Sequence, residues 1–161
     1  MNQTDTIGRA MANITAVLRD AEMVFQPFAP EDDATGFVIT FAKSDEMGGL
    51  IYVFPEQEQF AFYLMMLRPI PVETIARVAA LITRLNNELV VGNFELDYDE
   101  RAVQFKVSLV FRGAELSQAF VRNAILAGLD GMRAYAKVIG DVAAGQQTVP
   151  VALAAVMRAG G

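Results

Sequence analysis

Hydrophobic positions recur with two different periods along this chain. Between Val72 and Leu89 they recur every three or four residues, which predicts a long amphipathic helix with one buried side. From Phe94 to Leu109 they recur at every second residue on either side of the acidic turn 99–102, which predicts two paired strands. This stretch therefore predicts a helix that packs against a β-hairpin.

Three more strand-like runs precede the helix, at Phe37–Lys43, Leu50–Phe54 and Gln59–Leu67. Their connections are short, polar and contain glycine or proline, which favours an antiparallel meander. The segment Ala21–Ala29 contains proline, which cannot donate to a strand ladder, so this segment fits a short edge strand.

Helical periodicity returns near both ends of the sequence. It predicts helices over Asp5–Arg19 and Glu115–Ile139 and a short last helix over Val149–Arg158. Gly128 and Gly131 either weaken the long helix or permit close packing. The element order α-β-β-β-α-β-β-α predicts an α+β fold, an antiparallel sheet with helices packed on it.

Length and charge narrow the class of protein. The 161 residues fit a single domain, 1–161, with an ordered core over about 5–140 and a short C-terminal helix over about 149–158. The net charge of −6 gives no basic footprint for nucleic acid. No apolar run approaches the ~18 residues that a membrane span needs, and the first residues do not resemble a signal peptide. We therefore expect a cytoplasmic protein that binds neither nucleic acid nor membrane.

The residue types for common reaction chemistry are missing. The sequence has no histidine and no cysteine, which excludes the usual triads, thiol nucleophiles and zinc sites. Asp97, Asp99 and Glu100 begin like a calcium loop, but the glycine at position six and the glutamate at position twelve are absent. We interpret these carboxylates as a solvated turn. The sequence predicts no catalytic residue, metal ligand or cofactor, and we expect a protein that is not an enzyme.

The sequence favours protein binding over catalysis, because several predicted strands are apolar on both faces and must be covered on both. One such face contains methionine, which adapts to varied partners. The alternative is that the terminal helices cover this face as part of the core. Leu81, which lies off the main helical stripe, offers a second candidate interface. The candidate partner-binding residues are Ile51, Val53, Tyr63, Met65 and Leu67.

A small-molecule sensor is the alternative function. Its pocket would lie between the C-terminal helix and the sheet and would be lined by Phe120, Met132 and Tyr135.

The helix–hairpin segment also resembles a known family. The run I-T-R-L-N-N-E-L at 82–89, then G-N-F-E-L-D at 92–97 and the alternating strand at 103–109, is similar to the YbjN family. Members of this family resemble type III secretion chaperones in fold and are described as regulators of bacterial sensory transduction.

The resemblance implies a homodimer that is chaperone-like or regulatory and buries apolar segments of an unidentified partner protein. In the chaperones, the helix that corresponds to Val72–Leu89 commonly builds the dimer. The dimer-interface residues expected on this basis are Ile75, Val78, Leu81, Ile82 and Leu85.

Overall fold

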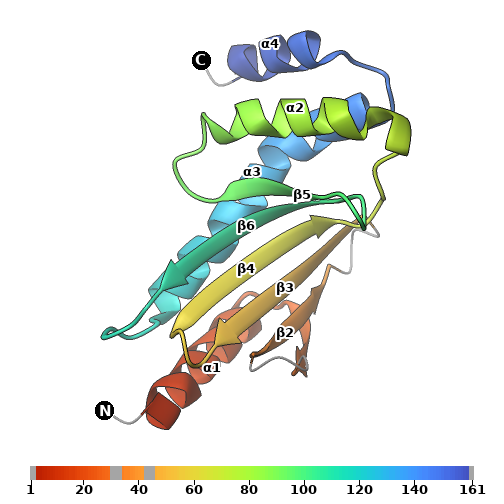
Figure 1. Cartoon of the computed structure of the whole chain (residues 1–161). Coiled ribbons are helices and arrows are strands. Elements are labelled where there is room, and N and C mark those ends of the chain that lie inside the picture. Colours follow the sequence, from red (N-terminus) through yellow and green to blue (C-terminus); the bar gives the residue numbers. More distant parts are fainter. Residues whose placement is uncertain (1–2, 30–33, 42–45, 160–161) are drawn as a thin grey trace.

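One antiparallel sheet organises the molecule. The computed structural model describes residues 3–29, 34–41 and 46–159, and within them the sheet has six strands in the order β1-β2-β3-β4-β6-β5. In Figure 1, α1 and α3 lie behind the sheet, whereas α2 and α4 lie across its upper end. The elements are α1 (Gln3–Asp20), β1 (Val24–Phe28), β2 (Thr35–Thr40), β3 (Met47–Phe54), β4 (Gln59–Met66), the 3₁₀ turn η1 (Val72–Thr74), α2 (Ile75–Asn86), β5 (Asn93–Asp97), β6 (Ala102–Val110), α3 (Gln118–Ala143) and α4 (Val149–Ala159).

The strand order confirms the predicted meander and hairpin. Strands β1 to β4 pair with their neighbours in chain order, and the proline-bearing β1 lies at the sheet edge as expected. The chain then runs through α2 to β5 at the opposite edge, and β6 returns between β4 and β5. The α+β class is therefore confirmed, with four strands before α2 instead of three.

The helices cover only one face of the sheet, which we call the inner face. A Cβ atom at Gly128 of α3 would lie 2.6 Å from the ring of Phe62, and one at Gly131 would lie 2.6 Å from the ring of Phe105. The two glycines therefore permit close packing of the helix on the sheet, which was one of the two roles considered for them. The side chains buried on the inner face are Phe37, Ile39, Ile51, Val53, Phe60, Phe62, Leu64, Phe94, Val103, Phe105 and Val107.

Element boundaries differ from the predictions where local interactions decide them. Strand β3 begins at Met47 and runs through two glycines, because side chains of neighbouring strands pack over the glycine backbone. Helix α3 begins later than expected, at Gln118, because the Ser117 hydroxyl accepts a hydrogen bond from Phe120 N and caps the helix. Lys43, the predicted end of β2, lies outside the described residues.

The junction of α2, β5 and β6 is held by side chains from the motif that resembles the YbjN family. The Asn86 amide donates to Phe94 O at 2.9 Å and accepts from Phe94 N at 2.8 Å, so it satisfies backbone groups on the edge strand β5. Gly92 has φ +75°, and the ring of Phe105 fills the space that a Cβ would need there. The Asp97 carboxylate accepts from the backbone N–H groups of residues 99 and 100, so the acidic segment is a turn.

Replacing Gly131 tests the helix–sheet contact. Gly131→Ala places a methyl group against the Phe105 ring, and we expect it to lower the free energy of unfolding by about 1–3 kcal/mol. Gly140→Ala is the control on the same helix, because no atom lies within 4 Å of the added Cβ. It should raise stability by about 0.5–1 kcal/mol through helix propensity alone. Urea unfolding measures both, and equal changes in the two variants would contradict the contact.

Replacing Asn86 tests the junction. Asn86→Ala leaves two part-buried backbone groups of Phe94 without their partner, and we expect a loss of about 1–3 kcal/mol of unfolding free energy. Asn87→Ala, at the exposed neighbouring residue, should change stability by less than about 0.5 kcal/mol. Equal urea midpoints for the two variants would show that the amide does not hold the junction.

Candidate protein-binding surfaces

The sheet face opposite the helices, which we call the outer face, is apolar on one half. Among the described residues, the side chains that strands β1 to β4 present on this face include no charged group. An antiparallel sheet normally presents polar side chains on a face that is open to water. The apolar side chains of the outer face are Val24, Phe28, Val38, Leu50, Tyr52, Phe54, Tyr63, Met65 and Leu67.

Aromatic rings form a continuous cluster on the outer face. Tyr52 lies at its centre, with its ring centroid 5.3 Å from Phe28, 5.8 Å from Phe54 and 5.7 Å from Tyr63. The Phe28 ring also lies over the backbone of Gly36. The rings therefore shield one another partly from water, which explains why they are half-buried although none of the described helices covers them.

A charged pair marks the border between the apolar and polar halves. Lys106 of β6 places its Nζ 5.4 Å from the centre of the Tyr63 ring and 3.3 Å from the Glu95 carboxylate. Partial burial alone lowers the pKa of Lys106, but Tyr63 and Glu95 together outweigh it and raise this pKa above its ordinary value. The amine therefore stays charged at neutral pH and ends the apolar surface at β6.

The structure separates the predicted partner-binding residues into two groups. Tyr63, Met65 and Leu67 lie on the outer face, where their binding role stays a prediction. The expectation that Ile51 and Val53 share this face is wrong, because both are fully buried on the inner face. The cause is the register of the hairpin. The hairpin of β3 and β4 closes on the pair Phe54–Gln59, so even-numbered residues of β3 lie beside odd-numbered residues of β4.

Sequence reasoning missed the residues of β3 that complete the outer face. Leu50 pairs with Tyr63, and Tyr52 pairs with Ala61, so these even-numbered residues lie beside the predicted ones. The alternation along β3 was visible in the sequence, but alternation alone does not say which half faces the helices. The register of the turn between β3 and β4 decides which residues of β3 face the helices.

The predicted dimer-interface residues on α2 are buried inside the chain itself. Val78, Leu81 and Leu85 are at most 1% exposed, and Ile82 is 5% exposed, whereas Ile75 is half-buried. In this conformation the first four have no surface to offer a second copy, so their assignment to the interface is corrected. The homodimer itself stays a prediction.

Helices α3 and α4 both pack against α2, in which Leu81 has no exposed surface. Thr74, the last residue of η1, donates its hydroxyl hydrogen to Ala143 O at 2.8 Å and so links the start of α2 to the end of α3. Helix α4 follows this point and packs against both α2 and α3, with Ala152 fully buried. Leu81 is therefore a core residue and not an open interface.

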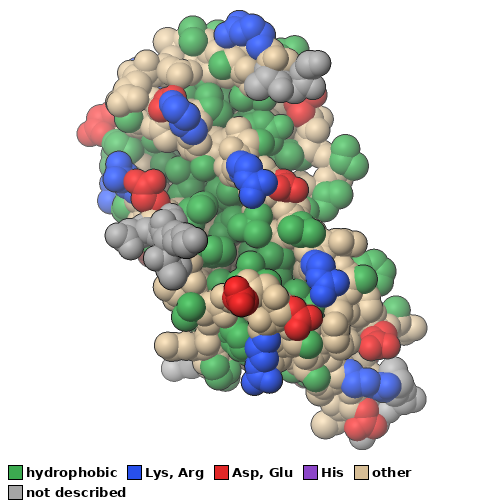
Figure 2. Space-filling view, turned by 180° about the vertical axis from the view of Figure 1, so that it is seen from behind, with side chains coloured by type: hydrophobic (Ala, Val, Ile, Leu, Met, Phe, Trp, Pro, Cys, Tyr) green, Lys and Arg blue, Asp and Glu red, His purple; other side chains and the backbone are tan. Residues whose placement is uncertain are grey.

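A second apolar surface lies on the helix side, and we call it the helix-side patch. Figure 2 shows hydrophobic side chains gathered in the middle of this side of the molecule. Met47 and Met66 are paired across β3 and β4 on the inner face, and the Phe41 ring lies over Gly49 beside them. These side chains pack against the core but stay partly exposed. The patch consists of Met23, Phe25, Phe41, Met47 and Met66.

The structure does not bring the predicted ligand-pocket residues together. Phe120 is 55% exposed, whereas Met132 is buried about 18 Å farther along the same helix. Tyr135 packs on Phe94, with ring centroids 5.9 Å apart. These three side chains therefore line no common pocket.

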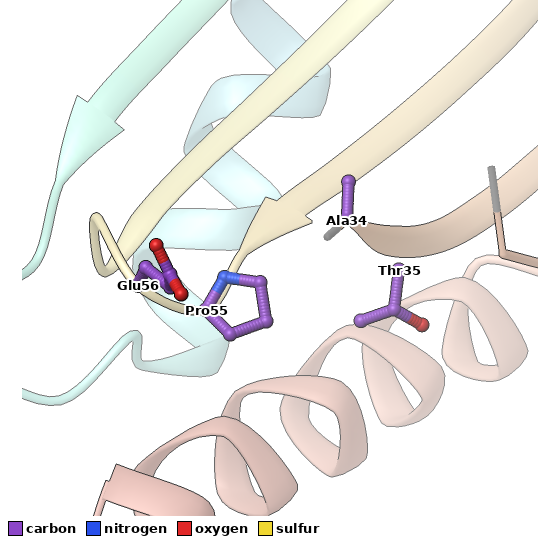
Figure 3. A pocket seen from close by; sticks show the side chains of 4 residues that line it. All are labelled: Ala34, Thr35, Pro55 and Glu56. Carbon is purple, nitrogen blue, oxygen red and sulfur yellow. The ribbon is translucent and has the colours of Figure 1, made fainter. Parts of the chain in front are cut away.

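A shallow hollow of about 370 Å³ lies elsewhere, between the start of β2 and the end of β3 (Figure 3). Among the described residues, Ala34, Thr35, Pro55 and Glu56 line it, and they contribute one hydroxyl and one carboxylate as side-chain polar groups.

The described part of the chain shows neither a cluster of metal ligands nor a helix that could span a membrane. Within residues 3–29, 34–41 and 46–159, no three acidic side chains are grouped closely enough to hold a metal ion. In the same ranges, no helix has the length and apolar character needed to cross a membrane.

Comparisons with known proteins identify the family. The model of the YbjN family, described as "Putative bacterial sensory transduction regulator", matches residues 11–141. The crystal structure of YbjN from E. coli matches with a TM-score of 0.55 and 16% identity, over 79% of this chain and 92% of that one. A structure of the ExsC–ExsE complex matches with a TM-score of 0.53 and 13% identity, over 78% and 88% of the two chains. No curated protein matches the sequence.

At these identities the matched structures establish the fold alone. They confirm the predicted α+β fold, an antiparallel sheet with helices packed on it. The family match covers most of the chain, and this protein therefore belongs to the YbjN family.

Proposed function

We propose that this protein is a non-enzymatic protein-binding module, chaperone-like or regulatory, that acts as a homodimer. In this proposal it buries an apolar segment of a partner protein against the outer face of the sheet. Its place in the cytoplasm stays a prediction.

The outer face carries the proposal. Strands β1 to β4 expose aliphatic and aromatic side chains there, and no described helix packs on them. Val24 is 54% exposed and Leu67 is 51% exposed, so apolar surface remains open at the ends of these strands. Contiguous apolar surface of this kind marks sites of protein interaction in soluble proteins.

The physical character of the face favours a segment that is apolar and uncharged. A charged side chain placed against Tyr52 and Leu50 would lose its hydration without gaining a partner. Apolar side chains would instead gain contact with the aromatic rings, which already hold one another in place. Met65 adds a flexible contact at the far end of the cluster, which accommodates more than one side-chain shape.

The comparisons support a role in protein binding. The matched ExsC–ExsE structure is a complex of two proteins, and the family is described in terms of regulation. The absence of histidine and cysteine from the sequence is consistent with a binding module. Apolar capture on the outer face is the simplest function that unites these observations.

Replacing Met65 tests the outer face. Met65→Glu places a carboxylate in the apolar half, and we expect it to reduce partner capture from a lysate of the source organism at least about tenfold. The matched control is Ser108→Glu, which adds the same charge to the polar half of the same face. The free energy of unfolding should change by less than about 1 kcal/mol in both variants. Unchanged capture by Met65→Glu would remove the outer face from the proposal.

Light scattering on a sizing column tests the homodimer. We expect a mass close to twice the 17.5 kDa of the chain. A single species at the mass of one chain would contradict the homodimer. Capture by the outer face would still be tested separately by the substitution of Met65.

A further inference from the structure

We propose that the segment captured by the outer face is an amphipathic helix of the partner protein with lysine or arginine along its flanks. The side of this helix that contacts β1 to β4 is apolar and uncharged. The inference rests on the proposed function and deepens it, because it names the conformation and the charge of the captured segment. It is supported by the obstructed edges of the sheet and by the distribution of charge around the outer face.

Both edges of the sheet are obstructed against an added strand. At β5, the Asn86 amide already occupies the N–H and the C=O of Phe94, and α2 packs beside this strand. At β1, the opposite edge, Pro27 has no N–H to donate to a further strand. An extended partner segment therefore finds no complete backbone ladder at either edge.

A segment on the outer face itself must satisfy its own backbone. The strands pair with one another within the sheet, so their faces offer side chains and not backbone N–H or C=O groups. An extended segment lying flat on apolar side chains would leave its backbone groups unpaired, whereas a helix bonds these groups internally. Strands β3 and β4 have eight residues each, so the face is about 26 Å long. A helix of about 18 residues spans this length.

The net negative charge of the described chain is concentrated around the outer face. In the two hairpins, 46–68 and 93–112, carboxylates outnumber basic side chains, whereas the two kinds occur in equal number over the rest of the described residues. The basic side chains of the hairpins are Arg68, Arg101, Lys106 and Arg112. We call the carboxylates of the hairpins the acidic rim, which consists of Glu46, Glu56, Glu58, Glu95, Asp97, Asp99 and Glu100.

Most of the acidic rim is available to a cationic partner. Among the described residues, ion pairs within the rim engage Glu46, with Arg68, and Glu95, with Lys106. The side chains of Glu56, Asp97, Asp99 and Glu100 are exposed and form no ion pair with a described basic side chain. A helix with basic flanks therefore gains ion pairs without breaking those of the chain, whereas a helix with acidic flanks meets like charges.

Three synthetic peptides of about 18 residues test the inference. The first has leucine and lysine at helical spacing, the second has the same residues in strict alternation, and the third has glutamate in place of lysine at helical spacing. We expect the first peptide to bind at least about tenfold more tightly than either of the others. Higher salt should reduce its advantage over the glutamate peptide, because salt screens exposed charges. Isothermal titration calorimetry measures the affinities.

Two double variants locate the charge that the leucine–lysine helix recognises. Glu56→Gln with Glu100→Gln removes two exposed carboxylates of the acidic rim, and Glu73→Gln with Glu88→Gln removes two exposed carboxylates at the ends of α2. Both change the net charge equally, so a difference between them reports local charge. We expect the first double variant to weaken binding of the leucine–lysine helix about threefold or more, and the second by less than about twofold.

The outcomes separate this inference from the proposed function. Tightest binding of the leucine–lysine helix, weakened mainly by the double variant of the acidic rim, supports the inference. It is overturned if that helix does not bind, if the alternating or the glutamate peptide binds as tightly, or if the two double variants have equal effects. Loss of partner capture in Met65→Glu would still support the outer face, because that experiment assumes neither the conformation nor the charge of the partner segment.

Discussion

The ring of Phe105 is the contact on which the rest of the structure depends. It lies between Gly92, which leads into β5, and Gly131 of α3, and at both glycines a Cβ would overlap the ring. The ring of Phe94 meets it edge-on, with centroids 4.9 Å apart. One side chain of β6 therefore fixes the distance between helix and sheet and the path into the edge strand. Any bulk added at these glycines must displace a ring that is 1% exposed.

Because of this constraint, the residues that most clearly resemble the YbjN family have structural roles. Asn86 joins the end of α2 to β5, Gly92 admits the Phe105 ring, and Asp97 forms the following turn. These residues build the junction and contribute little open surface for a partner. The proposed binding surface lies on the meander of β1 to β4, outside this junction but within the residues 11–141 that match the family.

The sequence was sufficient for the elements and insufficient for the surfaces. Periodicity identified the helices, the meander and the hairpin, because one face of each element is buried. It assigned Ile51 and Val53 to the face of Tyr63, since the register of a four-residue turn cannot be read from alternation alone. It also left Leu81 as an open residue, because the packing of α4 on α2 is a long-range contact. Helix α4 lies beyond the residues 11–141 that match the family, so the family resemblance could not indicate that α4 packs on α2.

If the outer face of the sheet binds an apolar segment of a partner protein, the two faces of β4 should respond differently to that segment. Methyl-labelled methionine gives the most direct measurement, because Met65 and Met66 report on opposite faces and can be assigned by single substitution to leucine. Addition of a captured partner segment should move Met65 and leave Met66 unchanged. Movement of both resonances together, or of Met66 alone, would contradict binding on the outer face.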